Sequence, residues 1–405
     1  MQAWRQGGSR GECTKREAPS LQRSAPPSPR RPHRSRNPQP PKICLELQGR
    51  IRAHLANEEI AEARKAFDGA KVPGEASAAW LMLGAEIGYA EFDYDGAIKA
   101  CNAAYGVDRE LKDLFWTRGR ARLQLHPDSL DGIDDLQHAI ELGLDTIDAR
   151  LTLARALIET ESATNDEQAL KILDEKAFES ETPDIQGRAA SLRGLYWSLQ
   201  AVRAEASAIW TARNNALEEA QRALLYAPKS SRVLARCGGL RLALALTPKN
   251  KEEALENLAT ACTLNPRDPM PYRLRGLYYG RNETYVKAQA DLEAAIDRGA
   301  QDADVYFILT YATVKNLSSQ NGLAVKAEAY SKRLLVLAPE RPKAHYWHGL
   351  AVAKQNRLPG GTAAGRASAK RELDAYYREA RGEEKRKARK KLKRVYRDMG
   401  FAPPD

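Results

Sequence analysis

The chain is poor in cysteine, and its thiols lack the spacing that metal or redox sites use. None of the five cysteines forms a CxxC pair; they stand at positions 13, 44, 101, 237 and 262. An odd, scattered set makes a poor disulfide framework, so we expect reduced, buried thiols and a cytoplasmic protein. His345 and His348 are three residues apart, but no neighbouring carboxylate or cysteine completes a ligand set. The sequence therefore predicts no metal.

Motifs of catalysis and of membrane insertion are missing as well. The sequence has no Walker phosphate loop, no Gly-x-Ser-x-Gly elbow and no Rossmann glycine fingerprint. The segment LPGGTAAG, which includes Gly360 and Gly361, has no Lys-Ser/Thr ending and indicates a loop between helices. No run approaches the ~20 apolar residues that span a bilayer. We expect no catalytic residues, no cofactor and no membrane association.

The net charge of +11 is concentrated at the two ends of the chain. Residues 1–42 carry +8 and residues 378–405 carry +6, which leaves −3 for the residues between them. Residues 1–42 are rich in Arg, Pro and Ser and too poor in apolar side chains to offset chain entropy, so the sequence predicts a disordered arm. The alternatives are a misassigned start, a nucleic acid or membrane contact, and a targeting segment.

One short pattern recurs along the rest of the chain: a small residue, an apolar residue four positions later, and another small residue three positions after that. This spacing marks one face of a helix. The first members of successive trios are separated by 34, 35, 37, 47, 38, 34, 39 and 42 residues, and they are Ala63, Ala97, Gly132, Ala169, Ala216, Ala254, Ala288, Ala327 and Ala369. Because no interval is below 34, the longer ones indicate insertions into one basic unit.

The best copy pairs Tyr272, Gly276 and Tyr279 on a first helix with the trio that begins at Ala288 on a second. This resembles the tetratricopeptide repeat family, whose units have an aromatic, Leu-Gly and Tyr on the first helix and Ala, an aromatic, Ala and Pro on the second. The resemblance implies an all-α fold, a right-handed α-solenoid of about nine helix-turn-helix units in residues 43–380. Asp268 followed by Pro269, and Arg341 followed by Pro342, predict two helix starts.

The C-terminal residues 381–405 have two interpretations. Ala388, Leu392 and Tyr396 share one helical stripe, and Lys and Arg occupy the other side, so we expect a basic amphipathic helix that caps the exposed end of the solenoid. Phosphate or acidic-partner binding by its outer face is an added or alternative role. A second special segment is the insertion between Tyr196 and Ala216, which lengthens one helix pair and either braces its neighbours or presents an aromatic ridge.

Arginine is the polar residue that recurs on the first helix of each pair. In the family this helix lines the concave surface, so the resemblance implies a groove in which guanidinium groups bind carboxylates of a partner protein. Some of these arginines must instead be solvated or paired with acids of adjacent units. The candidate partner-binding residues are Trp116, Arg120, Arg155, Arg236, Arg273 and Tyr346.

The leading hypothesis is a non-enzymatic adaptor or scaffold that binds an acidic segment of a protein or peptide in the concave groove. A nucleic-acid-associated protein that uses its basic termini is one alternative. The other is the sensor part of a larger enzyme. The family's chaperone-tail clamp of Lys and Asn is not supported, because no Asn occupies those helices.

Overall fold

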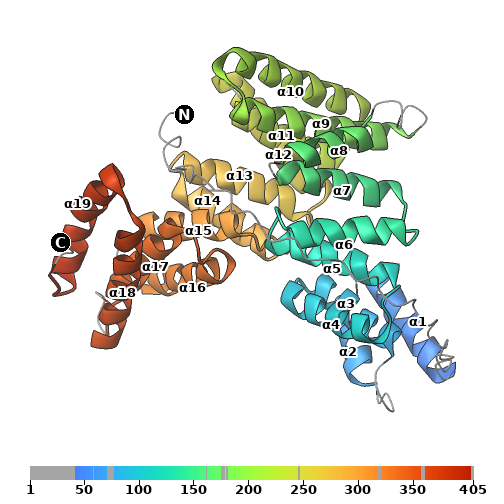
Figure 1. Cartoon of the computed structure of the whole chain (residues 1–405), viewed down its shortest axis with the longest axis horizontal. Helices are drawn as coiled ribbons and strands as arrows, with labels where there is room; N and C mark the ends of the chain where they lie inside the picture. Colours follow the sequence, from blue (N-terminus) through green and yellow to red (C-terminus); the bar gives the residue numbers. More distant parts are fainter. Residues whose placement is uncertain are drawn as a thin grey trace, which may run out of the picture. The chain divides into compact units, whose positions relative to one another are not determined.

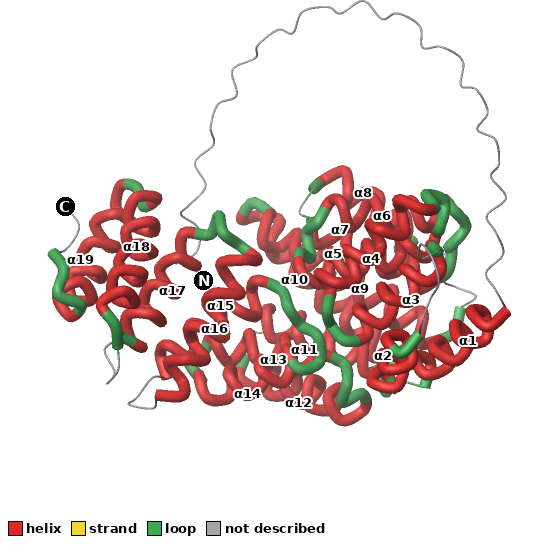
Figure 2. The backbone as a smooth tube through the Cα atoms, turned by 90° about the horizontal axis from the view of Figure 1, so that it is seen from below, coloured by secondary structure: helices red, strands yellow, loops and turns green. Residues whose placement is uncertain are grey.

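The computed structural model describes residues 42–402, apart from 58, 71–76, 161, 175–177, 179–180, 245–246, 317–320 and 357–360. The arm predicted for residues 1–42 lies almost wholly outside the described residues, and residues 42–405 form one compact unit. Every regular element within the described ranges is helical (Figure 2). The all-α prediction is confirmed.

The helices follow one another with short connections (Figure 1). In chain order they are α1 Lys42–Ala56, α2 Ile60–Asp68, α3 Ala78–Ala90, α4 Tyr94–Val107, α5 Lys112–Leu125, α6 Leu130–Glu141, α7 Ile147–Glu159, α8 Ala163–Ile172, α9 Pro183–Arg203, α10 Ala206–Tyr226, α11 Ser231–Leu244, α12 Pro248–Leu264, α13 Pro269–Arg281, α14 Tyr285–Ile296, α15 Ala303–Asn316, α16 Asn321–Leu337, α17 Pro342–Gln355, α18 Ala363–Glu379 and α19 Gly382–Asp398.

Each odd-numbered helix up to α17 packs most closely against the even-numbered helix that follows it. Neighbouring pairs touch through their odd-numbered helices, as α9 does with α11 and α11 with α13, and also where an even-numbered helix meets the next odd-numbered one, as α4 does with α5. The odd-numbered helices therefore form one layer and the even-numbered helices another. This stack of helix pairs is the predicted solenoid architecture.

The recurring trio occupies the buried face of the even-numbered helices. All three members are 0% exposed on α4, α10, α12, α14 and α16. Small residues at such positions let two helix backbones approach closely while the larger middle residue fills the groove between them. The register that was read from the sequence is thus confirmed.

Glycines on the odd-numbered helices mark the closest approach within a pair. A Cβ atom added to Gly119 would lie 2.8 Å from the carbonyl oxygen of Gly132, and one added to Gly276 would lie 2.7 Å from Leu292 Cγ. No side chain fits at either site without movement of the neighbour. A glycine costs a helix about 1 kcal/mol relative to alanine, and the close packing offsets this cost.

The predicted helix starts are also present. α13 begins at Pro269, and Asp268 Oδ1 accepts a hydrogen bond of 2.9 Å from the backbone N–H of Met270. α17 begins at Pro342 directly after Arg341. Proline suits the first turn of a helix because its missing N–H would have no intrahelical acceptor there.

Two turns far apart in the sequence are in direct contact. Tyr94 Oη donates a hydrogen bond of 2.9 Å to the carbonyl oxygen of Gly299, and Gln301 Nε2 donates one of 2.8 Å to the carbonyl oxygen of Phe92. Arg333 lies 3.3 Å from Asp95 beside them. We call this the turn contact; helices α4 to α14 lie between its two segments along the chain.

An apolar cluster extends the turn contact into the neighbouring helices. Ala121 and Leu125 of α5 pack with Tyr306 of α15 and with Leu334 and Leu337 of α16, and Figure 1 shows α5 and α15 near one another. The first helix pairs of the solenoid are thereby joined to later ones, and the intervening stack closes on itself.

Candidate functional site

The arginines of the odd-numbered helices fall into two groups with different roles. Each arginine of the first group directly precedes the glycine at the closest approach of its helix and binds a carboxylate on the even-numbered helix of the same pair. The shortest contacts are Arg118 to Asp135 at 2.7 Å, Arg193 to Glu219 at 3.0 Å and Arg275 to Asp291 at 2.7 Å. We call these three the hairpin clamps.

The hairpin clamps are structural ion pairs. Arg118 donates two hydrogen bonds to the carboxylate of Asp135, and Arg275 donates two to that of Asp291. The bonds to Asp291 raise the pKa of Arg275 above its usual value. Such fork-shaped contacts use two of the five donors of a guanidinium group and neutralise its charge. The clamps hold their three helix pairs together, and the charges of their arginines are already matched within the protein.

The second group forms a cluster on the side of α5, α7, α9 and α11 that faces away from the clamps. We call it the inner cluster: its members are Arg120, Asp148, Arg155, Glu159, Arg188, Arg232 and Arg236. Asp148 forms ion pairs with Arg188 and, at 3.9 Å, with Arg232. Side chains from four consecutive helix pairs therefore act on Asp148.

Positive charge is in excess within the inner cluster, because five guanidinium groups share the two carboxylates of Asp148 and Glu159. Arg155 is paired with Glu159 at 3.1 Å, one helical turn away. Arg236 forms no ion pair with the residues that the structure describes; its Nη1 donates a hydrogen bond of 2.9 Å to Ser191 Oγ. Burial and the neighbouring Arg155 lower the pKa of Arg236 to about 10, so it is still cationic at pH 7.

An aromatic wall stands beside the cluster on α3 and α5. The guanidinium of Arg120 lies 4.3 Å from the ring centroid of Tyr89 and 5.1 Å from that of Trp116. Cation–π contacts of this kind orient the guanidinium without neutralising it. Four of the candidate residues, Trp116, Arg120, Arg155 and Arg236, therefore lie in or beside the inner cluster.

The other two candidates are engaged by residues outside the inner cluster, although Glu159 of the cluster also acts on the charge of Arg273. Arg273 binds Asp302 at 2.6 Å. Burial alone would raise the pKa of Asp302, but the contact with Arg273 and hydrogen bonds from backbone N–H groups hold this pKa below its usual value. Tyr346 packs between the rings of Trp347 and Tyr376, at 5.0 Å from each, and burial raises its pKa to about 12. Partner binding by Arg273 and Tyr346 stays a prediction that would require these contacts to change.

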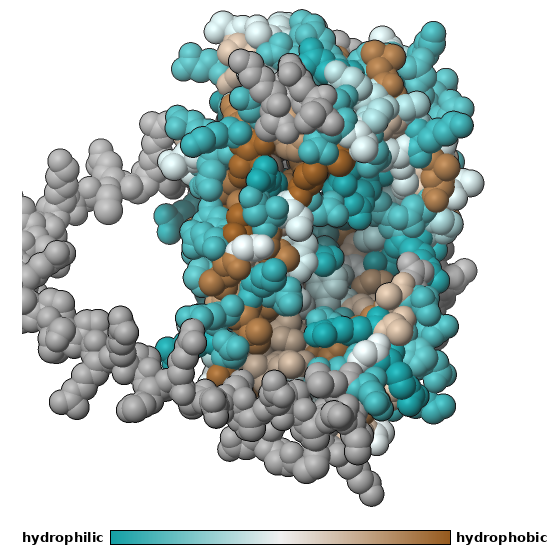
Figure 3. Space-filling model, turned by 90° about the vertical axis from the view of Figure 1, so that its right-hand side faces the viewer, coloured by the Kyte–Doolittle hydropathy of each residue, from teal (hydrophilic) through white to brown (hydrophobic). Residues whose placement is uncertain are grey.

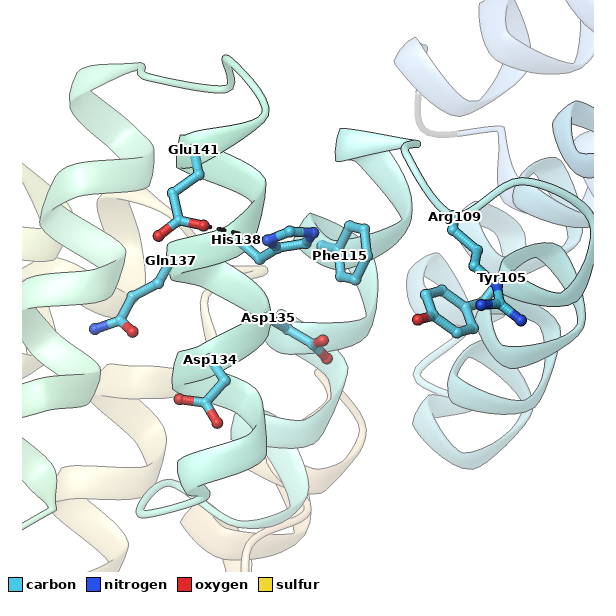
Figure 4. A pocket seen from close by; sticks show the side chains of 8 residues that line it. All are labelled: Tyr105, Arg109, Phe115, Asp134, Asp135, Gln137, His138 and Glu141. Atoms are coloured by element: carbon cyan, nitrogen blue, oxygen red, sulfur yellow. Dashed lines mark hydrogen bonds and ion pairs between the residues drawn. The ribbon is translucent and has the colours of Figure 1, made fainter. Parts of the chain in front are cut away.

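A pocket of about 440 Å³ lies apart from the inner cluster, where the C-terminal end of α4 meets α5 and α6 (Figure 4). Tyr105, Phe115 and His138 line it, with the His138 ring centroid 4.3 Å from that of Phe115. Asp135, the acid of the first clamp, lies at its base. None of the predicted site residues lines this pocket, and we assign it no ligand.

The two histidines of α17 bind protein groups rather than each other. His345 Nδ1 lies 2.7 Å from Glu372, and His348 Nδ1 lies 2.8 Å from the buried Ser331 Oγ. Ser331 Oγ donates its proton to the carbonyl oxygen of Glu328, so it accepts from His348 and is not activated as a nucleophile. No three His, Cys, Asp or Glu side chains gather as a metal site anywhere in the described chain.

These contacts predict opposite pH dependences for the two histidines. Burial lowers the pKa of His345, but the hydrogen bond to Glu372 raises this pKa above its usual value. The stability that His345 contributes is therefore present below pH 6.5 and is lost as the pH rises through the folded-state pKa. Burial lowers the pKa of His348, so its contribution is present above pH 6.5 and is lost as the pH falls from there through the folded-state pKa. Melting curves from pH 5 to 8 should show His345→Gln most harmful at pH 5 and His348→Gln most harmful at pH 8. Parallel curves for the two variants would contradict both assignments.

The predicted insertion lengthens α9 and α10 to 21 residues each. Trp197 packs against the buried residues that join α10 to α11, which fits the bracing interpretation. Trp210 is 61% exposed near the tip, with the Arg213 guanidinium 5.9 Å from its ring centroid. The insertion therefore braces the stack and also exposes one large aromatic side chain.

On the face seen in Figure 3, hydrophobic residues form narrow bands among hydrophilic ones.

The C-terminal helix α19 has the amphipathic arrangement that was predicted. Ala388, Leu392 and Tyr396 are buried against the cluster of α17 and α18, at 1%, 0% and 0% exposure. Its Lys and Arg side chains are exposed. The stack thus ends in a helix whose outer face is polar, as a solenoid terminus requires.

Comparison with known proteins gives distant structural likenesses only. No protein-family model matches the chain, and no curated protein does. Yeast Tom70 aligns with a TM-score of 0.36 at 11% identity, over 87% of this chain and 96% of Tom70. A human IFIT1 dimer with PPP-AAAA aligns with a TM-score of 0.40 at 13% identity, over 81% of each chain. Likeness this distant says nothing about the ligand of this chain.

The class of the protein follows from its own helices. Paired helices, buried small-apolar-small trios and glycines at the crossings define an α-solenoid of tetratricopeptide-like repeats. None of the described helices is both long enough and apolar enough to span a bilayer.

Proposed function

We propose that this protein is an adaptor whose inner cluster binds an acidic, extended segment of a partner protein. The observation that supports it is the excess of guanidinium groups in the inner cluster, where Arg236 forms no ion pair with the residues that the structure describes. Like charges gathered in this way repel one another, so a bound carboxylate would relieve the repulsion. Arginine also presents a planar fork that matches carboxylate geometry.

The cluster is open enough to meet such a ligand. The side chain of Arg155 is 39% exposed and that of Arg232 is 58% exposed. Trp116 and Tyr89 beside Arg120 supply an apolar wall, and aromatic and arginine side chains together are typical of the residues that dominate binding energy. An extended acidic segment with a large apolar side chain near its acidic residues would therefore fit best.

The test is a double charge reversal on the inner face. Arg155→Glu with Arg232→Glu should weaken binding of fluorescein-labelled, glutamate-rich peptides of about fifteen residues at least tenfold, or about 1.4 kcal/mol, because two attractive charges become repulsive. Fluorescence anisotropy measures the affinity. The matched control is Arg150→Glu with Arg222→Glu, which makes the same charge change on two exposed arginines outside the inner cluster.

Three results decide the matter. Unchanged binding by the control and unchanged melting of both variants would support the inner face as the site. Equal loss in both double variants would mean that net charge, not the cluster, attracts the peptide. Failure of the unmodified chain to bind any acidic peptide would overturn the proposal.

A further inference from the structure

The outer face of α19 carries a straight row of cations. Arg386, Lys390, Lys393 and Arg397 are separated by four, three and four residues, which places them on one stripe of the helix. This stripe lies opposite the buried Ala388, Leu392 and Tyr396. We call it the cationic stripe; it extends over about 16 Å at 1.5 Å per residue.

The cations of the stripe are not neutralised by the protein. Arg386, Lys390, Lys393 and Arg397 form no ion pair within the described residues, and all four are exposed. The basic residues that flank the stripe do have partners: Lys387 binds Glu383 at 2.9 Å, and Arg394 lies 3.8 Å from Asp398. Glu383 and Asp398 are thus paired at the flanks, and the stripe stays positive along its length.

The stripe is held in place by the packing of the helix. Tyr396 Oη donates a hydrogen bond of 2.5 Å to Asp374 of α18, and Asp374 also binds Lys370 at 2.6 Å. Lys385 lies 4.9 Å from the ring centroid of Tyr377, which fixes the start of the helix against α18. A ligand that binds along the stripe therefore meets a helix that is already ordered, and the cost of ordering it does not reduce the affinity.

We propose that the cationic stripe binds the phosphate backbone of a nucleic acid, without reading its base sequence. Phosphates repeat regularly along a strand, and a row of Lys and Arg at helical spacing is the chemistry that neutralises them. No large apolar side chain of α19 is exposed. Protein interfaces rely on aromatic and apolar centres and are depleted in Lys, so a partner protein fits this surface less well.

A membrane also fits the cationic stripe less well than a nucleic acid does. Interfacial helices insert an apolar face among lipid acyl chains. The apolar face of α19 is occupied by α17 and α18, through Val352, Leu373 and their neighbours. Only the charged side remains available, and it offers no group that prefers a lipid interior.

The test neutralises the stripe in the full chain. The variant Arg386→Gln, Lys390→Gln, Lys393→Gln, Arg397→Gln should bind a fluorescein-labelled 20-nucleotide single-stranded RNA of mixed sequence at least tenfold more weakly in 50 mM salt. The slope of log affinity against log salt should decrease in magnitude by about 3, because each lost phosphate contact removes about 0.7 for a single strand.

The control removes four cations from other exposed places while the stripe stays intact. Its substitutions, on α4, α5, α8 and α12, are Lys99→Gln, Lys112→Gln, Lys171→Gln and Lys249→Gln, at four exposed lysines that form no ion pair within the described residues. Net charge is then equal in the two variants, and only the position of the lost charge differs. Unchanged melting temperatures for both would show that the stripe variant remains folded.

Several outcomes would overturn the proposal. The first is equal RNA binding by the stripe variant and its control. The second is loss of binding to phosphatidylserine vesicles or to glutamate-rich peptides while RNA binding is unchanged, which would assign the stripe to a membrane or to a protein. The variant with Arg155→Glu and Arg232→Glu should bind RNA as the unmodified chain does, so failure of this inference and failure of the adaptor proposal give different results.

Discussion

Replacing Asp135 with alanine should destabilise the protein by about 3 kcal/mol, because the substitution leaves a charged guanidinium without its counter-ion in a buried place. Asp135 is 5% exposed, and Arg118 and Arg122 both lie 2.7 Å from its carboxylate. Arg118 is 9% exposed and cannot turn to solvent as Arg122 can. Urea unfolding followed by circular dichroism, with hydrogen exchange of α5 and α6 as a local measure, checks the prediction.

A double replacement separates the lost ion pair from lost packing. Arg118→Met with Asp135→Leu puts apolar groups of similar size where the ion pair stood, and it should recover most of the loss, since no buried charge is left without a partner. A single Asp135→Ala variant as stable as the unmodified chain would show that Arg118 is solvated and that the hairpin clamp contributes little.

The helix register could be predicted from the sequence because it depends on local spacing. The trio that begins at Ala288 repeats at helical intervals, and its three members are fully buried. The starts at Pro269 and Pro342 depend only on the first turn of each helix. Side-chain size and capping chemistry act within a few residues, so they can be read from one sequence.

The two roles of arginine were harder to separate, although the sequence holds the signal. Arg118 and Arg120 flank Gly119, yet the first binds Asp135 and the second lies over two aromatic rings. An acid directly precedes the middle residue of the trio wherever an arginine directly precedes the glycine, and these acids are Asp135, Glu219 and Asp291. Matching these two positions would have identified the hairpin clamps.

Contacts between different helix pairs could not be predicted in this way. Arg273 was a groove candidate, but it binds Asp302 at the start of the following helix pair. The turn contact between Tyr94 and Gly299 depends on the small rotation that each helix pair adds to the stack. Small angles accumulate over many repeats, and no local pattern in the sequence states their sum.

Gly299 stands at the centre of the turn contact, where the backbone and the neighbouring rings leave no room for a side chain. Gly299→Ala should cost about 3 kcal/mol, from backbone strain at φ 95° and from steric conflict. A Cβ atom at Gly299 would lie 2.4 Å from Phe92 Cδ1 and 2.6 Å from Tyr94 Oη, so both rings would have to move and the hydrogen bond from Tyr94 would break. Thermal unfolding measures the stability, and small-angle X-ray scattering measures whether the radius of gyration increases as the contact opens.

Gly143 supplies a control in the same molecule. Its φ is also 95°, but a Cβ atom there would meet nothing within 4 Å, so Gly143→Ala should show the backbone strain alone, about 1 kcal/mol, with no change in radius of gyration. Equal losses in the two variants would mean that the turn contact adds no stability.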